Sequence, residues 1–383
     1  MKKSKTNYQR FYVGMILPIA FFLSYFILSA QILTRAGEYS TMTEIVKTIK
    51  DTNGIYGPAL YETTFWYKKE IYQQYPPNIA ALGSSRVLQF RADRFKDPFI
   101  NLGSMRSLDE VIEILKDLFT DAPPEILLLG IDFWWFRPQA EDEKFNRSPE
   151  HPRIRLIDLF EPLRWLARDK LQLRDIGAIL SATTPHLGIA GISRQDGFDV
   201  HGSYHYTSTF TGRVPNYDWK FLNTLTRIEN GDRVFGHSAK ISEKQWKKLE
   251  DLLADLAKRK IKVILFMPPL APIAVDAIKA APSSYGYVTH VRDRLPRLAA
   301  KYNMPYADFH DLRPQGSHDC EFLDGVHGGE IAYDRILLAL SNEKTPLAEK
   351  LDLSRITKSI ETHKGRVTDS PEEADFLGIG CKK

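Results

Sequence analysis

The sequence has few cysteines, little net charge and no excess of glycine or proline, and each shortage excludes a class of protein. Only Cys320 and Cys381 occur in 383 residues, which excludes a disulfide-built scaffold and a structural CxxC zinc module. A formal net charge of +4 is too small to indicate nucleic-acid binding. With 23 Gly, 22 Pro and 43% hydrophobic residues, the chain is neither collagen-like, disordered nor a polytopic membrane protein. We therefore expect an ordinary folded protein.

One long apolar run stands out against this composition. Residues 11–33 carry no charge, and as a helix they would span roughly 35 Å, enough to cross a bilayer. Lys2, Lys3, Lys5 and Arg10 precede the run with no acidic residue among them, so the positive-inside rule keeps residues 1–10 cytoplasmic. We predict a signal-anchor at 11–34 in the cytoplasmic (inner) membrane, with the rest periplasmic or extracellular. A cleaved signal peptide is the alternative, although this run is longer than its usual apolar region.

Short apolar runs recur along the rest of the chain and alternate with amphipathic helical patterns. Such runs are typical of strands that helices cover on both faces, so we predict a three-layer, doubly wound parallel α/β sheet that binds ligands at the strands' carboxyl ends. Ser242 and Gln245 predict a capping box at the start of one helix, and another helix is expected over 287–302. The predicted strands are residues 78–82, 98–102, 125–129, 262–266 and 305–309.

These patterns predict a domain at 78–344, preceded by a partly helical linker at 35–77 and followed by a short helix and a mobile tail at 345–383. An insertion at 137–240, after the third strand, interrupts the domain with polar and aromatic residues. It is either a surface loop region or a lid or acceptor-binding wall over the active edge of the sheet. Cys320 and Cys381 are compatible with one disulfide and equally with a free thiol in the tail.

Residues able to do chemistry follow two of the predicted strands. Ser84 and Ser85 lie in the turn after the first strand, where a serine hydroxyl can be exposed or can simply cap a helix. Asp324 and His327, three residues apart, follow the fifth strand. That spacing can hold a carboxylate against the imidazole Nδ1 and aim Nε2 at a serine, although a solvated loop would have the same pattern.

In this order and at these strand ends, the residues resemble four sequence blocks of the SGNH/GDSL hydrolase superfamily, which has a flavodoxin-like fold. Gly83-Ser84-Ser85 resembles the nucleophile block, whose serine stands third. Asn101-Leu102-Gly103 resembles the block whose glycine N–H helps to form the oxyanion hole, and Gly130-Ile131-Asp132 stands where the family has Gly-x-Asn-Asp. Asp324 and His327 match the last block. The resemblance covers about residues 78–342 and implies catalysis by Ser85, His327 and Asp324.

The same resemblance implies an oxyanion hole formed by the Ser85 and Gly103 N–H groups, with Asp132 at the third position. The family's Asn donates a hydrogen bond there, whereas an ionised Asp would repel the oxyanion. Four roles are therefore open for Asp132. It is protonated, it binds an acceptor hydroxyl, it pairs with Arg86, or it has no role in an oxyanion hole that lacks a third donor. We also expect Arg86 and His310 to contact substrate. For His310 there are two alternatives: a structural role, or a role as the catalytic base in place of His327.

Possible metal ligands are dense near the last block, but no HxH or HExxH spacing occurs, so we predict no metal and no cofactor. These ligand types are found at His310, Asp311, His318, Asp319, Cys320, Asp324 and His327.

A single anchor joined to an external domain with a Gly-Ser-Ser block resembles the SGNH partners of multispanning MBOAT acyltransferases, among them DltD-like proteins, although Arg86 differs from the Glu expected there. This resemblance implies O-acyl transfer, of acetyl or a similar group, onto a cell-envelope polysaccharide, with an MBOAT partner and no nucleic acid. The alternatives are a membrane-anchored carbohydrate esterase and a catalytically inactive SGNH module that binds glycan or acts as a scaffold.

Overall fold

The computed structural model describes residues 2–143, 147–342 and 345–381. The remaining residues, which belong to the predicted cytoplasmic segment, insertion, domain end and tail, lie outside this description. The chain forms two compact units, a smaller one of residues 1–63 and 147–197 and a larger one of residues 64–146 and 198–383. The predicted insertion at 137–240 is therefore divided between the two units.

The larger unit contains one five-stranded sheet in which every pair of neighbouring strands is parallel, with the order β2-β1-β3-β6-β7. This confirms the predicted α/β class with a parallel sheet. The chain moves outward from β1 in one direction to β2 and in the other to β3, so the carboxyl ends of β1 and β3 flank the topological switch point. The strands are β1 Ile79–Leu82, β2 Phe99–Asn101, β3 Ile126–Gly130, β6 Lys262–Met267 and β7 Tyr306–Asp308.

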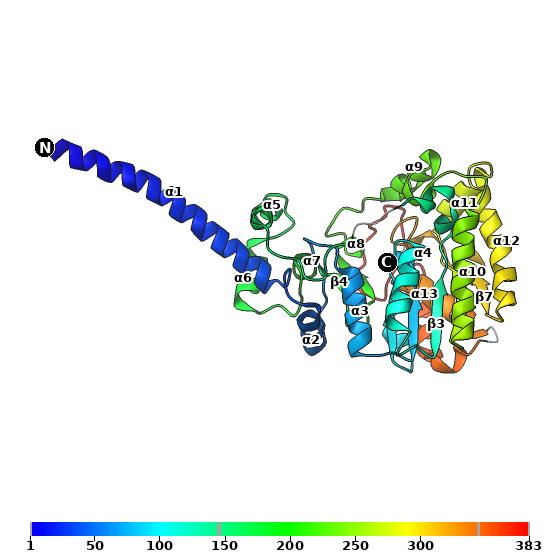
Figure 1. The fold of residues 1–383 in the computed structure, drawn as a ribbon. Helices are drawn as coiled ribbons and strands as arrows, with labels where there is room; N and C mark the ends of the chain where they lie inside the picture. The colour runs from blue at the N-terminus through cyan, green and yellow to red at the C-terminus, as the bar shows by residue number, and fades with distance from the viewer. Residues whose placement is uncertain (1, 144–146, 343–344, 382–383) are drawn as a thin grey trace. The chain divides into compact units, whose positions relative to one another are not determined.

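Helices cover both faces of the sheet. On one face, Tyr333, Ile336 and Leu340 of α13 share a buried core with Ala81 of β1 and Leu128 of β3. Figure 1 shows α4 and α10 on the opposite side of the strands. The helices and remaining strands of this unit are α3 Thr64–Gln74, α4 Leu108–Leu118, β5 Tyr204–Tyr206, α8 Thr207–Phe210, α9 Leu222–Asn230, α10 Glu243–Lys258, α11 Pro272–Ala280, α12 Gly286–Lys301, α13 Glu330–Asn342 and α14 Leu353–His363, and β4 Asp196–Phe198 lies at the boundary between the units.

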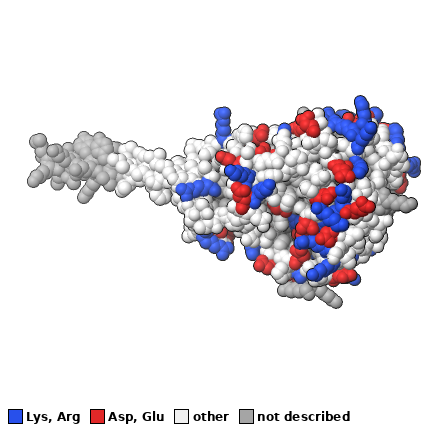
Figure 2. Space-filling view, turned by 90° about the horizontal axis from the view of Figure 1, so that it is seen from below, with Lys and Arg blue, Asp and Glu red and all other residues white. Residues whose placement is uncertain are grey.

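The start of α10 and the surface charges of the protein add two details. Ser242 caps α10 by accepting the Gln245 N–H, but the Gln245 side chain bonds the carbonyl of Ala140, so the capping box is half formed. On the face seen in Figure 2, Lys and Arg are interspersed with Asp and Glu.

The smaller unit is built around the C-terminal part of α1 (Lys2–Arg35). One stretch of α1, Gly14–Arg35, is long and apolar enough to cross a membrane, and its most apolar 18 residues have a mean hydropathy of 2.1. Ile32 and Leu33 at its end are buried against Trp165 and Ile179, so the predicted span at 11–34 is partly core. The Glu38 carboxylate accepts the N–H groups of the neighbouring residues Ala59 and Leu60 and of Ile189, which is 151 residues away. The other helices are α2 Met42–Thr52, α5 Glu161–Ala167, α6 Leu173–Ser181 and α7 Ile189–Arg194.

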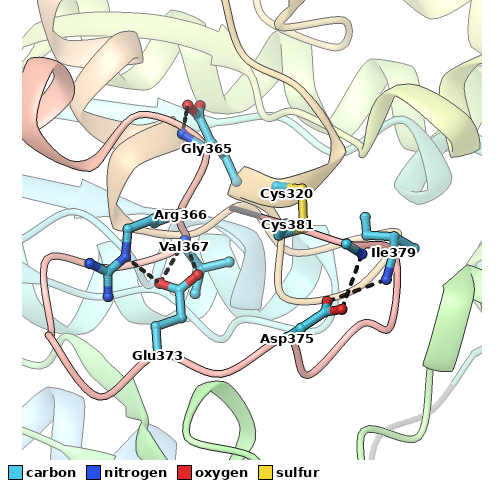
Figure 3. Close-up of a disulfide and its surroundings, with 10 residues drawn as sticks. Cys320, Gly365, Arg366, Val367, Glu373, Asp375, Ile379 and Cys381 are labelled. Carbon is cyan, nitrogen blue, oxygen red and sulfur yellow. Dashed lines mark hydrogen bonds and ion pairs between the residues drawn. A yellow bond between two sulfur atoms is a disulfide. The ribbon is translucent and has the colours of Figure 1, made fainter. Parts of the chain in front are cut away.

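The chain after α14 is held to the larger unit, in contrast to the predicted mobile tail. Val367, Phe376 and Leu377 are buried together with Phe210 and Phe322. Cys320 and Cys381, 61 residues apart, form a disulfide with their Cα atoms 5.5 Å apart. Figure 3 shows this bond and, in the same segment of chain, Glu373, which accepts the Val367 N–H. Apolar residues are too sparse in this segment to produce a recognisable pattern, which is why the sequence does not reveal its packing.

Candidate functional site

Ser85 lies in the turn that follows β1, at the switch point of the sheet. The turn is so tight that residue 83 has no room for a side chain, since a Cβ there would come within 2.8 Å of a Val87 methyl. The Ser84 hydroxyl then accepts the Arg86 N–H and starts the short 3₁₀ helix Ser85–Val87. Ser85 itself is half-buried. Its hydroxyl is thus presented at the edge of the sheet where ligands bind in this fold class.

The loop between β7 and α13 brings His327 and Asp324 to Ser85. Ser85 Oγ lies 2.8 Å from His327 Nε2, and His327 Nδ1 lies 2.8 Å from Asp324 Oδ2. Burial raises the pKa of Asp324, but the nearby imidazole of His327 and hydrogen bonds from Tyr217 and the Val326 N–H outweigh it and bring the pKa to about 2. The ionised Asp324 therefore fixes the proton on Nδ1, which leaves Nε2 free to accept the proton of Ser85.

Residues of the predicted insertion hold this loop in place. The Tyr217 hydroxyl donates a hydrogen bond to Asp324 Oδ2. The fully buried carboxylate of Asp218 accepts the N–H of Gly325 at 2.8 Å and the hydroxyl of Thr224 at 2.7 Å. This part of the insertion therefore contacts the loop that carries Asp324 and Gly325 and helps to fix its position. No motif in the sequence connects Tyr217 or Asp218 to Asp324.

The Gly103 N–H, predicted to face the oxyanion, already has a partner inside the protein. It donates to Asn101 Oδ1 at 2.9 Å, and the Asn101 amide in turn donates to the carbonyl of Val87. Ser104, the next residue, adopts a φ of 89° and lines the same pocket as Ser85. A positive φ at a residue other than glycine is a strained conformation that is concentrated at functional sites.

Asp132 lies at the end of β3 and is completely buried in an ion pair with Arg86, at 2.8 Å. Burial raises the pKa of the Asp132 carboxyl, while the Arg86 guanidinium opposes this shift. Arg86 also donates to the carbonyls of Pro268 and Pro269, directly after β6. The pair therefore joins the ends of three strands beneath the site. Of the four predicted roles for Asp132, the structure shows the ion pair with Arg86. Neither residue lines the pocket beside Ser85.

His310, the other predicted substrate contact, is also buried. Its ring packs edge-on against Phe133, with centroids 5.6 Å apart, and desolvation holds its pKa well below the usual range. It does not line the pocket at Ser85. Within residues 2–143, 147–342 and 345–381, no three His, Cys, Asp or Glu side chains form a group that could hold a metal ion. The candidate ligands have other partners, such as Arg313 for Asp311 and the disulfide for Cys320.

A pocket of about 420 Å³ opens beside Ser85. That volume lies in the range of small-molecule sites. The pocket combines an aromatic surface with three guanidinium groups, of which Arg106 is paired with Glu110 and Arg137 with Glu143, so it can hold a polar group. Its lining residues are Ser84, Ser85, Ser104, Met105, Arg106, Trp134, Arg137, Glu143, Arg233 and Val234.

The structure thus brings Ser85, His327 and Asp324 together and places Arg86, Asp132 and His310 in the interior. Comparison with models of known protein families and with curated proteins finds no match for this chain.

Proposed function

We propose that this protein is a membrane-anchored, serine-dependent O-acyltransferase of the SGNH type that acts on a cell-envelope polysaccharide. The observation that carries the proposal is the hydrogen-bonded chain from Ser85 Oγ through His327 to Asp324. A hydroxyl whose proton can pass to an oriented imidazole is an activated nucleophile. The strand order, with Ser85 at the switch point, agrees with a flavodoxin-like SGNH domain.

In the proposed reaction, Ser85 Oγ attacks the carbonyl carbon of a donor ester while His327 Nε2 takes the hydroxyl proton. The tetrahedral intermediate collapses, the C–O bond to the donor alcohol breaks, and His327 returns the proton to that alcohol. The acceptor hydroxyl then attacks the acyl-Ser85 ester by the same steps in reverse order, which regenerates Ser85. Asp324, ionised throughout, stabilises the imidazolium in both halves of the reaction.

The oxyanion needs N–H donors, and we assign them to Ser85 and Ser104. The Gly103 N–H is occupied by Asn101, whereas Ser104 lines the pocket next to Ser85 in a strained conformation. Each donor of this kind contributes a factor of about 10² to 10³ in rate.

The anchored location is supported at both ends of the chain. The positive residues before α1 favour a cytoplasmic N-terminus. The disulfide between Cys320 and Cys381 favours an oxidising compartment for the larger unit, since cytosolic thiols are kept reduced. We therefore place the catalytic unit on the periplasmic or extracellular side, where a multispanning MBOAT partner would supply the acyl group.

Transfer and hydrolysis differ in the acceptor, so the test is a competition between glycan and water. Purified protein incubated with an activated acetyl ester and polysaccharide oligomers should form acetylated oligomers, detected by mass spectrometry, while ester hydrolysis falls as the oligomer concentration rises. Hydrolysis that is unaffected by glycan would support the esterase alternative. Ser283→Ala, a change at an exposed serine before α12, serves as the control and should behave as the unmodified protein.

Tyr217→Phe should slow acylation of Ser85 about tenfold, because a hydrogen bond to a charged group contributes about 1.5 to 3 kcal/mol and only part of it acts in the transition state. The rate of inactivation by a serine-directed phosphonate measures this step. Asp324 should remain ionised without the tyrosine, so the loss should be the same from pH 6 to 9. An unchanged rate would show that Tyr217 does not position the carboxylate.

A further inference from the structure

Five large apolar side chains of the smaller unit are exposed within one short segment. Between 47% and 78% of the surface of each is exposed, whereas apolar residues on the surface of soluble proteins are normally scattered singly. We call residues 154–173 the foot segment; it comprises the 3₁₀ helix Leu156–Phe160, α5 and the start of α6. The five residues are Ile154, Leu156, Ile157, Leu163 and Leu173.

The foot segment is fixed against α1. The Tyr25 hydroxyl donates to the Leu159 carbonyl at 2.8 Å, and the rings of Phe26 and Phe160 pack edge-to-face with centroids 5.3 Å apart. Further along α1, Ile32 and Leu33 are buried with Trp165 of α5. Figure 1 shows α5 beside the C-terminal part of α1. The exposed apolar residues are thus continuous with the helix that we expect to cross the membrane.

These contacts define where α1 can leave the bilayer. If all of Gly14–Arg35 lay in hydrocarbon, Tyr25 and its contact with Leu159 would lie about 15 Å below the surface, near the bilayer midplane. The foot segment cannot lie there, because its Arg155 and Arg164 side chains are 63% and 51% exposed and a charge at the midplane is costly. A span of residues 11–28 still covers roughly 27 Å, which is enough.

The foot segment therefore lies at the depth where α1 enters the headgroup region. Large apolar side chains interspersed with exposed basic residues are the composition of interfacial segments that lie flat on a bilayer. Within the foot segment, four basic residues oppose three acidic ones, and all four basic side chains are exposed while Asp158 is buried. These exposed basic side chains suit anionic lipid headgroups.

We propose that the foot segment is a second membrane contact, which inserts its apolar side chains into the outer leaflet of the bilayer beside α1. This inference rests on the anchoring of α1 that is part of the proposed function. Together the two contacts would fix the smaller unit on the membrane surface, so that α1 is not its only attachment.

The test uses spin labels on the full chain in vesicles of phosphatidylcholine and phosphatidylglycerol. Because the two native cysteines are paired, a single introduced cysteine carries the label alone. Leu156→Cys and Leu173→Cys report on the foot segment, Lys47→Cys, at an exposed residue of α2, is the matched control, and Phe21→Cys reports on α1. The foot labels should show a several-fold higher ratio of oxygen to nickel-complex collision rates than the Lys47→Cys label.

Foot labels as accessible to the nickel complex as the label at Lys47→Cys, while Phe21→Cys is buried in lipid, would overturn this inference and leave the anchor intact. Foot labels shielded from both reagents would indicate protein covering the segment and would also overturn it. A Phe21→Cys label exposed to water would contradict the anchor itself.

Discussion

Ser85→Ala should abolish covalent labelling by a serine-directed phosphonate and lower acyl turnover by about 10⁶-fold, the loss found when the nucleophile of a serine triad is removed. The reason is geometric. Ser85 Oγ is the hydroxyl that lies 2.8 Å from an imidazole whose other nitrogen is held by a buried carboxylate. Intact-mass spectrometry of the phosphonate adduct measures the labelling, and release of a chromogenic alcohol from an acetyl ester measures the turnover.

The variant should fold normally, because a half-buried hydroxyl contributes little to stability once its partner is a solvent-accessible imidazole. Its thermal unfolding should match that of Ser283→Ala, which should still be labelled at Ser85. Labelling that persists in Ser85→Ala would identify a different nucleophile and refute the proposed centre. A lack of labelling in the unmodified protein would instead favour the inactive glycan-binding alternative.

Much of the fold and of the arrangement of Ser85, His327 and Asp324 could be predicted from the sequence, because both depend on short-range features. The five strands are brief apolar runs, a pattern that helices covering both faces impose. Asp324 and His327 are three residues apart, and that spacing alone brings a carboxylate within reach of Nδ1. Ser85 follows the first strand, so the parallel topology brings it to the same sheet edge as the loop after β7.

The features that the sequence did not reveal depend on long-range packing. Tyr217 reaches Asp324 across 107 residues, from an insertion without a recognisable motif. Arg86 adjoins Ser85, which suggested a substrate contact, but the 3₁₀ turn directs its side chain into the interior. The Gly103 N–H lay in the expected sequence block, yet the Asn101 side chain two residues earlier accepts it. In each case the position of a hydrogen-bond partner in three dimensions, and not the motif, decides the direction of the group.

Asp132→Asn should destabilise the larger unit by about 3 to 5 kcal/mol, the cost of removing one partner from a buried ion pair. Arg86 cannot give up its charge, and both side chains are fully buried, so the substitution leaves an uncompensated guanidinium in the interior. Urea unfolding followed by tryptophan fluorescence measures the loss as a lower transition midpoint. Asp109→Asn, which breaks the exposed pair with Lys248, is the matched control and should cost about 1 kcal/mol at most.

The same substitution separates the two roles that Asp132 could have. If position 132 faced the oxyanion, asparagine would supply the donor that the aspartate lacks, and acyl turnover should rise by about 10²- to 10³-fold without a large loss of stability. If the pair with Arg86 is structural, turnover should not rise and the protein should unfold more readily. The double variant Arg86→Met, Asp132→Leu should recover most of the stability, because apolar replacement of a whole buried pair is often neutral. A stable, faster Asp132→Asn enzyme would therefore contradict the structural role and return Asp132 to the active site.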